Sequence, residues 1–511
     1  MIEVRYKDSN LVDQESQLFK TLLDAHQRLI RKDFNIWGPE ASSEAKIRMD
    51  WIDLPILSRE LLTQLDALTA KFRHLSTIIL CGMGGSSLGP EVIAQTYGKE
   101  LIVLDSTDPH YVARCLPDKL DSTLVIVGSK SGSTIETASQ KAFFESHFEA
   151  AGLDKTKHII IITDPNSPLD IESRESGLTV INANPHVGGR FSVLGAFGLV
   201  PSAFLGIDVS IILDSAADTK ESLINDPFPA LLAAYAIITG TEQYFSVTDE
   251  NSQMPGLSDW IEQLVAESTG KNGVGRLPIV IAKAEDPLPP QTLTVSFAAE
   301  TDLKIAGDLG SQFFFWEWVT ALVGAGLSID PFNQPNVQES KLASGTLLAT
   351  WGHSIPALKN TGSDKSIAYF RESNNVTTLL KDFLNQIQDN GYLAIMAYLD
   401  REKDSELMQL RNILARKTSK AVTFGWGPRF LHSTGQYHKG AQPNGAFLQI
   451  TGESDVDFEI PGKDFTFKSL IAAQANGDEN AISSRGLPIL QLHLLDRTQG
   501  ISQLLAIARK L

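Results

Sequence analysis

A loop rich in hydroxyl side chains points most directly to chemistry. Ser129-Lys130-Ser131-Gly132-Ser133-Thr134 follows the apolar run Leu124–Val127 and precedes a helical pattern that starts at Ile135. A helix start offers unpaired N–H groups and a positive dipole end, which suit a phosphate, and Gly132 lets the backbone approach a ligand. The loop lacks the Gly-Lys-Ser/Thr of a P-loop, which favours a phosphorylated small molecule over a nucleotide. A βα turn with capping serines explains this segment alone equally well.

A glycine-rich loop, Cys81–Pro90, follows another apolar run. Its glycines allow a tight turn and close approach of a ligand. The main competitor is a dinucleotide-binding turn, Gly-x-Gly-x-x-Gly. Its third glycine would fall at Ser87, so that match fails.

Two charged residues stand beside glycines. Arg190 follows Gly188 and Gly189 and can direct a permanent positive charge into a cleft. The alternative is that Arg190 is a surface arginine in a solvated ion pair.

Glu267 lies where the helical pattern Trp260–Ala266 meets a glycine loop. A partly desolvated carboxylate there can act as a base, whereas a solvated helix-end glutamate is the alternative.

The segment Asp330–Lys341 carries further polar side chains after the apolar run Phe313–Ile329. Gln334 and Lys341 are seven residues apart. If the chain is helical after Pro335, this spacing is about two turns, and both side chains face one cleft.

Five ordered motifs resemble those of the phosphoglucose isomerase family, whose members interconvert glucose 6-phosphate and fructose 6-phosphate. They are Gly-Gly-Ser-x-Leu-Gly-Pro at Gly84–Pro90, the Ser-Lys-Ser/Thr loop at Ser129–Thr134, Gly-Gly-Arg-Phe-Ser-Val-Leu at Gly188–Leu194, Glu-Ser-x-Gly-Lys at Glu267–Lys271 and Asp-Pro-Phe-Asn-Gln-Pro-x-Val…Lys at Asp330–Lys341. The resemblance implies two sugar-isomerase (SIS-type) α/β/α sandwich domains and a homodimer.

The resemblance also implies a role for each matching residue. Ser129, Ser131 and Thr134 would hold the phosphate with Lys130 in the same loop, and Gly85, Ser86 and Gly189 would line the sugar. Glu267 would move a proton between C2 and C1, Arg190 would stabilise the cis-enediolate, Gln334 would contact the substrate, and Lys341 would lie near the ring oxygen. This route requires no metal and no other cofactor.

One family feature is missing. The family usually has a ring-opening histidine downstream of the Glu-Ser motif, but no histidine lies between His186 and His353 here. The later segment Pro428–Gly440 resembles the isomerase half of transaldolase–isomerase fusion proteins, although no transaldolase barrel fits within this chain. We expect His432, or else His438, to open the ring, with Lys341 and a water as the rival. A structural loop in which one histidine caps a strand is the alternative.

The elements that must position these residues follow a βα rhythm after an N-terminal region, up to about Arg73, that looks helical. The strands expected in the first domain are Thr77–Cys81, Leu101–Asp105, Leu124–Val127, His158–Thr163 and Leu178–Ile181. Those expected in the second are Leu277–Ala282, Thr292–Ser296, Leu393–Ala397 and Lys420–Phe424, with further apolar segments near Phe447–Ile450 and Ile489–His493. Continuous apolar strands separated by helices predict doubly wound α/β domains. We expect residues 1–255 to hold the N-terminal helices and the first domain, and residues 256–511 the second domain with a C-terminal extension.

Composition narrows the class of protein. The formal net charge of −17 argues against a nucleic-acid partner, and two cysteines exclude a disulfide scaffold. The first residues lack the apolar core of a signal peptide. The apolar run Phe313–Ile329 is broken by Glu317, which predicts a buried helix rather than a membrane span. We therefore expect a cytoplasmic protein without a membrane partner. A sugar-phosphate sensor on the same fold, or an isomerase that also accepts mannose 6-phosphate, are the alternative functions.

Overall fold

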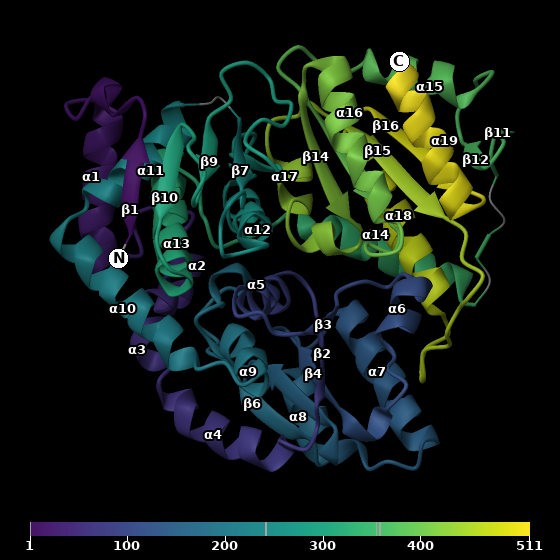
Figure 1. The fold of residues 1–511 in the computed structure, drawn as a ribbon, viewed down its shortest axis with the longest axis horizontal. Helices are drawn as coiled ribbons and strands as arrows, with labels where there is room; N and C mark the ends of the chain where they lie inside the picture. Colours follow the sequence, from purple (N-terminus) through teal and green to yellow (C-terminus); the bar gives the residue numbers. More distant parts are fainter. Residues whose placement is uncertain (1, 241–242, 354, 357–358) are drawn as a thin grey trace. The chain divides into compact units, whose positions relative to one another are not determined.

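The computed structural model describes residues 2–240, 243–353, 355–356 and 359–511 (Figure 1). The chain forms two compact units. Unit 1 comprises Met1–Asp105, Pro117–Ala284 and Thr292–Gln334, and unit 2 comprises Ser106–Leu116, Glu285–Gln291 and Pro335–Leu511. Most of the predicted site residues therefore lie in unit 1, whereas Lys341, His432 and His438 lie in unit 2.

The first sheet of unit 1 is parallel, with the strand order β3-β2-β4-β5-β6. Its strands are β2 (Thr77–Gly82), β3 (Ile102–Leu104), β4 (Thr123–Gly128), β5 (Ile159–Thr163) and β6 (Thr179–Asn182). Alternate side chains such as Leu80 and Ile126 join one core cluster with α4 (Glu60–Phe72) and α9 (Ala196–Phe204), because successive side chains of a strand point to opposite faces. Figure 1 shows α9 and α7 (Ile135–Ala150) on opposite sides of this sheet.

The second sheet of unit 1 has the order β1-β10-β9-β7-β8. Its strands are β1 (Glu3–Tyr6), β7 (Tyr244–Thr248), β8 (Leu277–Val280), β9 (Thr294–Ser296) and β10 (Leu303–Ala306). Only β1 is antiparallel to its neighbour. Beyond the N-terminal region, the unit also contains helices α5 (Leu88–Thr96), α8 (Pro168–Glu175), α10 (Val209–Asn225), α11 (Phe228–Thr239), α12 (Leu257–Thr269) and α13 (Leu309–Gly326). The predicted fold class is thus confirmed, because both sheets are of the covered, doubly wound kind.

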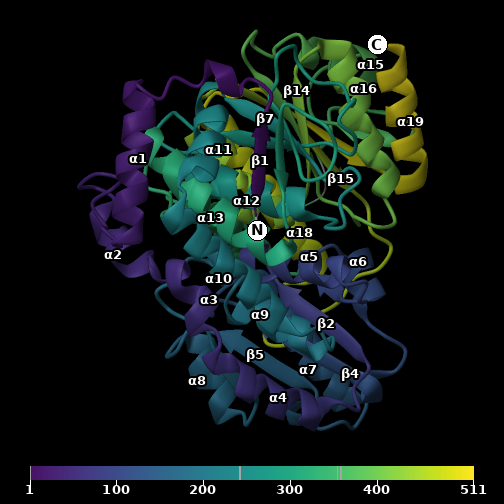
Figure 2. The ribbon, with the colours of Figure 1, turned by 60° about the vertical axis from the view of Figure 1, so that its left-hand side comes forward.

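The N-terminal region is mostly helical, as predicted, but it begins with a strand. Helices α1 (Gln17–Ile30), α2 (Ser42–Arg48), α3 (Leu54–Leu57) and α4 follow one another along the outside of unit 1 (Figure 2, purple). In β1, Glu3 and Arg5 are exposed while Val4 and Tyr6 pack on the core. The prediction of helix was wrong for this segment because four residues are too short to reveal a period of two.

Unit 2 contains a third sheet with the order β11-β12-β16-β15-β13-β14. Its strands are β11 (Gly362–Asp364), β12 (Ile367–Tyr369), β13 (Tyr392–Ala397), β14 (Ala421–Trp426), β15 (Gly445–Gly452) and β16 (Ile489–Leu494). The helices of unit 2 are α6 (Pro109–Cys115), α14 (Val337–Trp351), α15 (Val376–Leu384), α16 (Gln409–Thr418), α17 (Gly435–Gly440), α18 (Phe467–Ser483) and α19 (Arg497–Lys510). The strands expected at Leu393–Ala397 and Lys420–Phe424 therefore pair in a different sheet from β8 and β9. An apolar pattern predicts a strand but not its hydrogen-bonded neighbour.

The predicted domain boundary at residues 255 and 256 does not coincide with the division into units. It falls between β7 and α12, and β7 pairs with both β8 and β9. No strand was predicted at Tyr244–Thr248, so the predicted boundary separates β7 from the second sheet, to which it belongs.

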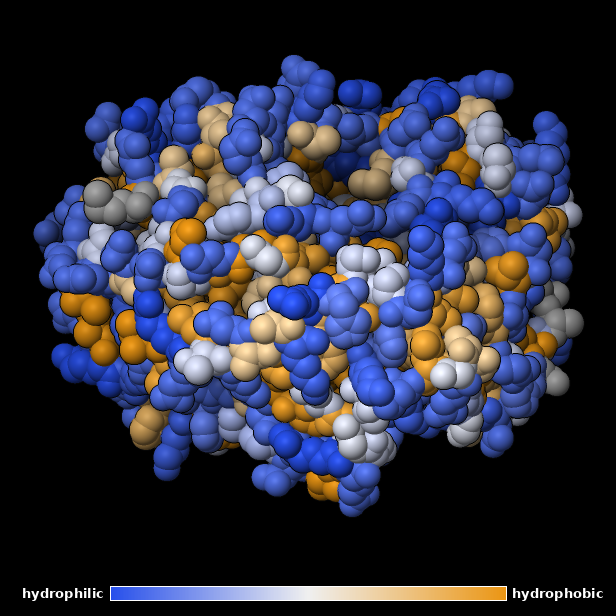
Figure 3. Space-filling view, turned by 60° about the horizontal axis from the view of Figure 1, so that its bottom comes forward, coloured by the Kyte–Doolittle hydropathy of each residue, from blue (hydrophilic) through white to orange (hydrophobic). Residues whose placement is uncertain are grey.

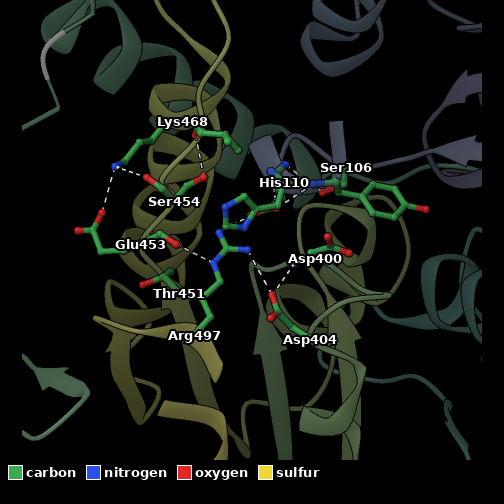
Figure 4. Close-up of polar contacts among 12 residues, drawn as sticks. Ser106, His110, Asp400, Asp404, Thr451, Glu453, Ser454, Lys468 and Arg497 are labelled. Carbon is green, nitrogen blue, oxygen red and sulfur yellow. Dashed lines mark hydrogen bonds and ion pairs between the residues drawn. The ribbon is translucent and has the colours of Figure 1, made fainter. Parts of the chain in front are cut away.

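An ionic network fixes α6 within unit 2 (Figure 4). The Arg497 guanidinium donates to the carboxylates of Asp108 and Asp404 and to the carbonyl oxygen of Glu453, at 2.6, 3.2 and 2.7 Å. Arg114 of α6 pairs with the fully buried Asp400. The buried charges of Arg497, Asp404 and Asp400 thus each have a partner of opposite sign, as buried ions must.

Within the described ranges, no single helix is long and apolar enough to cross a membrane. Helices α10 and α11 together have the length and apolar composition of a membrane span, but the chain bends by 87° between them. On the face shown in Figure 3, hydrophilic side chains surround smaller hydrophobic patches. The predicted reading of Phe313–Ile329 as a buried helix is confirmed by α13, which is buried along almost its whole length.

The buried carboxyl of Glu317 in α13 predicts a pH dependence of stability. Its side chain is fully buried and neither oxygen has a hydrogen-bond partner, and burial raises its pKa well above the ordinary 4.5. The folded state then holds this proton more tightly than the unfolded state, so the free energy of unfolding falls as pH rises above 4.5 toward the folded pKa. We expect Glu317→Gln to flatten that decline in urea unfolding measured across pH. Glu221→Gln on the exposed face of α10 is the control, and a decline that persists in Glu317→Gln contradicts the assignment.

Candidate active site

The Arg190 side chain is the centre of the predicted site. It lies in a short 3-10 helix, Gly189–Phe191, and is 4% exposed. Its Nε donates to Ser268 Oγ at 2.9 Å, and its Nη2 donates to the carbonyl oxygens of Pro331 and Asn333 at 2.8 and 3.1 Å. Its Nη1 donates to Gln334 Oε1 at 2.9 Å. These contacts exclude the alternative that Arg190 is a surface arginine in a solvated ion pair.

The Glu267 carboxylate meets this guanidinium directly. Glu267 lies near the end of α12, is 9% exposed, and places Oε1 3.1 Å from Arg190 Nη1. Its other oxygen accepts a hydrogen bond from Gln263 Nε2 at 3.3 Å. Gln263 was missed in the sequence reading, although its i, i+4 spacing from Glu267 on a helix was a usable signal. A solvated helix-end glutamate is excluded by this burial.

Gly85 allows the loop that carries Arg190 to approach the glycine-rich loop Cys81–Pro90. A Cβ added at Gly85 would lie 2.1 Å from the carbonyl oxygen of Gly189. Gly85 and Ser86 are buried in a 3-10 helix, Gly84–Ser86, directly after β2. The glycine is required here by close packing of two backbones, whatever else it contacts.

The hydroxyl-rich loop follows β4 and leads into α7, as the sequence predicts. Ser129 Oγ donates to Thr134 Oγ1 at 3.3 Å, and the Ser131 side chain is exposed. Gly132 has a φ of +67°, and an added Cβ would lie 2.8 Å from Ser167 Oγ, so no other residue fits this turn without strain.

Lys130 has a partner of its own in the same loop. Its Nζ donates to both carboxylate oxygens of Asp164 at 2.8 and 2.6 Å. Burial lowers the pKa of Lys130 and raises the pKa of Asp164, while the pair's mutual attraction opposes both shifts. The ion pair ties the loop to the segment after β5, which is a positional role for Lys130.

The loops form one connected region of unit 1. A Cβ added at Gly128, next to Ser129, would lie 3.3 Å from Ser86 Cβ. Gly85 in turn approaches Gly189, and Arg190 contacts Glu267 and Gln334. The carboxyl ends of parallel strands meet at one edge of a sheet, which is why loops after β2 and β4 gather here.

The predicted residues beyond Gln334 lie in unit 2. Helix α14 begins at Val337, so helical spacing does not relate Gln334 to Lys341, whose side chain is exposed. The expectation that seven residues make two turns was wrong because Gln334 belongs to the preceding turn. His432 ends a 3-10 helix, Arg429–His432, and is partly exposed.

His438 has the surroundings of a core residue. Its ring Nδ1 lies 2.9 Å from the Tyr392 hydroxyl, and the two rings stack. Burial, with a smaller contribution from Lys439, lowers the pKa of His438 to about 3. The imidazole is therefore neutral near pH 7, which suits packing better than proton exchange with a solvated sugar.

Residues 60–276 match the sequence model of the family described as phosphoglucose isomerase. The predicted resemblance to that family is confirmed over this stretch, which contains the glycine-rich loop Cys81–Pro90, the hydroxyl-rich loop, Arg190 and Glu267. The similarity of Pro428–Gly440 to fusion proteins stays a prediction.

Similar proteins carry the same description. A probable glucose-6-phosphate isomerase of Haloarcula marismortui is 34% identical over 219 residues, 41% of this chain and 50% of the relative. A glucose-6-phosphate isomerase of Campylobacter jejuni is 32% identical over 226 residues, 42% of this chain and 56% of the relative. The chain thus spans about half the length of the curated relatives it matches.

A solved structure shares the fold. A glucose-6-phosphate isomerase from Chlamydia trachomatis aligns with a TM-score of 0.54 and 18% identity, over 68% of this chain and 88% of that one.

Among the residues that the structure describes, no group of three or more His, Cys, Asp or Glu side chains is arranged to hold a metal ion.

The contact between Gly85 and Gly189 predicts a difference between two glycine substitutions. Gly85→Ala forces the Gly188–Arg190 backbone to move, and overpacking of this kind costs about 1–3 kcal/mol of folding free energy. Gly188→Ala meets nothing within 4 Å and is the matched control. Urea unfolding of both variants checks this; equal stability of Gly85→Ala and wild type would show that the loops can separate freely.

Proposed function

We propose that this chain catalyses the reversible isomerisation of glucose 6-phosphate and fructose 6-phosphate through a cis-enediolate, without a metal. The observation that carries the proposal is the buried pair of Glu267 and Arg190, 3.1 Å apart, within the stretch that matches the phosphoglucose isomerase family. A carboxylate and a fixed positive charge are the two groups that proton transfer next to a carbonyl requires.

Glu267 supplies the base in this proposal. Its carboxylate removes the proton from C2 of the open-chain aldose, the C–H electron pair forms the C1–C2 double bond, and O1 takes the negative charge. The proton of the O2 hydroxyl passes to O1, C2 becomes the carbonyl carbon, and the Glu267 carboxyl returns its proton to C1. Arg190 lies beside the developing charge, and its guanidinium cannot lose its own proton in the process.

The hydroxyl-rich loop supplies the phosphate site. Ser129, Ser131 and Thr134 offer hydroxyl donors, and the first N–H groups of α7 add the positive end of the helix dipole. Thr134 is the N-cap of α7, but its side chain makes no capping hydrogen bond. Its Oγ1 accepts from Ser129, which leaves its own O–H to donate to a phosphate oxygen. Gly85, Ser86, Gly189 and Gln334 line the sugar in this proposal.

His432 is our first candidate for opening the sugar ring, with Lys341 acting through a water as the second. The partly exposed imidazole of His432 can exchange protons with a sugar, whereas His438 is buried against Tyr392. We also propose a homodimer in the cytoplasm, as the family resemblance implies.

Two alternatives remain beside this function. A sugar-phosphate sensor needs the phosphate loop but no base, so the buried pair of Glu267 and Arg190 favours an enzyme. An isomerase that also accepts mannose 6-phosphate would use the same residues, because selection between C2 epimers depends on the shape of the pocket.

The proposed reaction is tested with the purified chain. We expect glucose 6-phosphate to form from fructose 6-phosphate in a coupled assay, at the same rate with and without EDTA. Mannose 6-phosphate supplied in parallel measures the breadth of substrates. Absence of conversion, or activity that EDTA abolishes and a metal restores, contradicts the proposal.

Glu267→Gln tests the base. A glutamine fills the same space and can accept Gln263's hydrogen bond, but it cannot take a proton, so we expect kcat to fall by about 10²–10⁴-fold with the fold retained. Glu262→Gln on the same helix is the control and should keep wild-type kcat. Near-normal turnover of Glu267→Gln would place the base elsewhere.

Thr134→Ala tests the phosphate loop. Because the phosphate is remote from the reacting carbons, loss of this hydroxyl should raise KM by roughly 10-fold and change kcat less. Ser146→Ala on α7 serves as the control, since its hydroxyl bonds only within the helix. An unchanged KM when Ser129, Ser131 and Thr134 are each replaced would rule the loop out as the phosphate site.

A further inference from the structure

A buried ammonium group stands next to the proposed catalytic pair without a role so far. Lys271 follows α12 and is 1% exposed. Its Nζ donates to the carbonyl oxygens of Asp330 and Asn333 at 2.6 and 2.5 Å and to Asn333 Oδ1 at 3.0 Å. Three acceptors match the three N–H donors of an ammonium group.

The acceptors of Lys271 belong to the same turn that receives Arg190. The Asn333 carbonyl oxygen accepts from Lys271 Nζ and also from Arg190 Nη2, at 3.1 Å. The Pro331 carbonyl oxygen, between the two bonded positions, accepts from Arg190 Nη2 at 2.8 Å and from its Nε at 3.3 Å. Two cations from different segments therefore hold the Asp330–Asn333 turn.

The turn ends at a residue of the proposed site. Gln334 follows Asn333 directly and accepts from Arg190 Nη1, the nitrogen that also faces Glu267. A shift of the turn would move the carbonyl oxygens that orient Arg190 and the Gln334 side chain together.

Burying a second cation beside Arg190 carries a desolvation penalty, so we expect the charge of Lys271 to have a function. Burial and the charge of Arg190 lower the pKa of Lys271, whereas Asp330 and Glu267 oppose that shift. A neutral amine would have two N–H donors for three acceptors, so the observed hydrogen bonds require the ammonium form. An apolar residue would avoid the desolvation penalty but would leave the carbonyl oxygen of Asp330 without this donor.

We propose that Lys271 is a positioning residue that fixes the Asp330–Gln334 turn, and through it the guanidinium of Arg190, for the enediolate. This inference rests on the proposed function and adds a residue to it. Lys271 acts through Arg190 and does not contact the sugar, so its effect falls on the transition state rather than on binding of the phosphate.

The test compares two inhibitors on Lys271→Met. A phosphorylated hydroxamate carries enediolate-like charge, and a phosphorylated polyol does not. We expect kcat to fall by more than about 10-fold and hydroxamate affinity to fall similarly, with KM and polyol affinity changed by less than about 3-fold. A general loss of structure would weaken both inhibitors alike, and that result overturns the proposal.

Arg276→Met is the matched control. Arg276 is also a buried cation of unit 1 bonded to backbone carbonyl oxygens, those of Ile237, Ile238 and Gly275, and none of these bonds reaches the Asp330–Gln334 turn. Its loss should lower thermal stability as much as Lys271→Met does, while the ratio of hydroxamate to polyol affinity stays at the wild-type value. A ratio that falls equally in both variants contradicts a specific role of Lys271.

A milder variant covers the case in which Lys271→Met does not fold. Asn333→Ala removes one acceptor of Lys271 from an exposed side chain, and it should weaken the hydroxamate more than the polyol by roughly 3-fold. An inactive wild type overturns the proposed function and this inference with it. An active wild type with unchanged kcat and inhibitor ratio in Lys271→Met, or in Asn333→Ala if the former does not fold, overturns the inference alone.

Discussion

The buried charge of Arg190 is the constraint on which the rest of the site depends. A guanidinium cannot shed its proton at physiological pH, so a nearly fully buried one must find oxygen acceptors. Unit 1 meets that demand with Ser268 Oγ, two carbonyl oxygens of the Asp330–Asn333 turn, and the side chains of Gln334 and Glu267. The same contacts that satisfy the charge also bring a carboxylate and an amide to it.

The two sheets of unit 1 supply these groups from separate directions. The loops after β2 and β4 belong to the first sheet, and α12 and the turn after α13 belong to the layer around the second sheet. Arg190, whose loop follows β6 of the first sheet, joins the two sets through its hydrogen bonds to Ser268 and Pro331. Gly85 and Gly189 are in close backbone contact within the first set. Glycine therefore contributes to the site by its small size, which lets the Arg190 loop lie directly on the loop after β2.

Much of unit 1 could be predicted from the sequence. Each strand expected between Thr77 and Ile181 is present within two residues, because continuous Ile, Val and Leu runs are typical of buried parallel strands. The strands β1, β7 and β10 were not predicted because they are short and partly polar, so the extent of the second sheet was not predicted either.

The partners of individual side chains could not be predicted from the sequence. Lys130 was placed in the phosphate loop by its motif, but its pairing with Asp164 depends on how the segment after β5 folds back. Gln263 and Lys271 lay inside or next to recognised segments, yet only the tertiary structure shows what they bond.

Glu267 and Arg190 together form, in our proposal, a centre for proton transfer through an enediolate. Isomerisation in D2O, followed by proton NMR over many turnovers, tests that claim most directly. A proton held on a carboxyl group between removal and return exchanges with solvent, so the account predicts deuterium at C1 of fructose 6-phosphate and at C2 of glucose 6-phosphate. Complete retention of the original hydrogen after many turnovers would indicate a direct hydride shift and would contradict it.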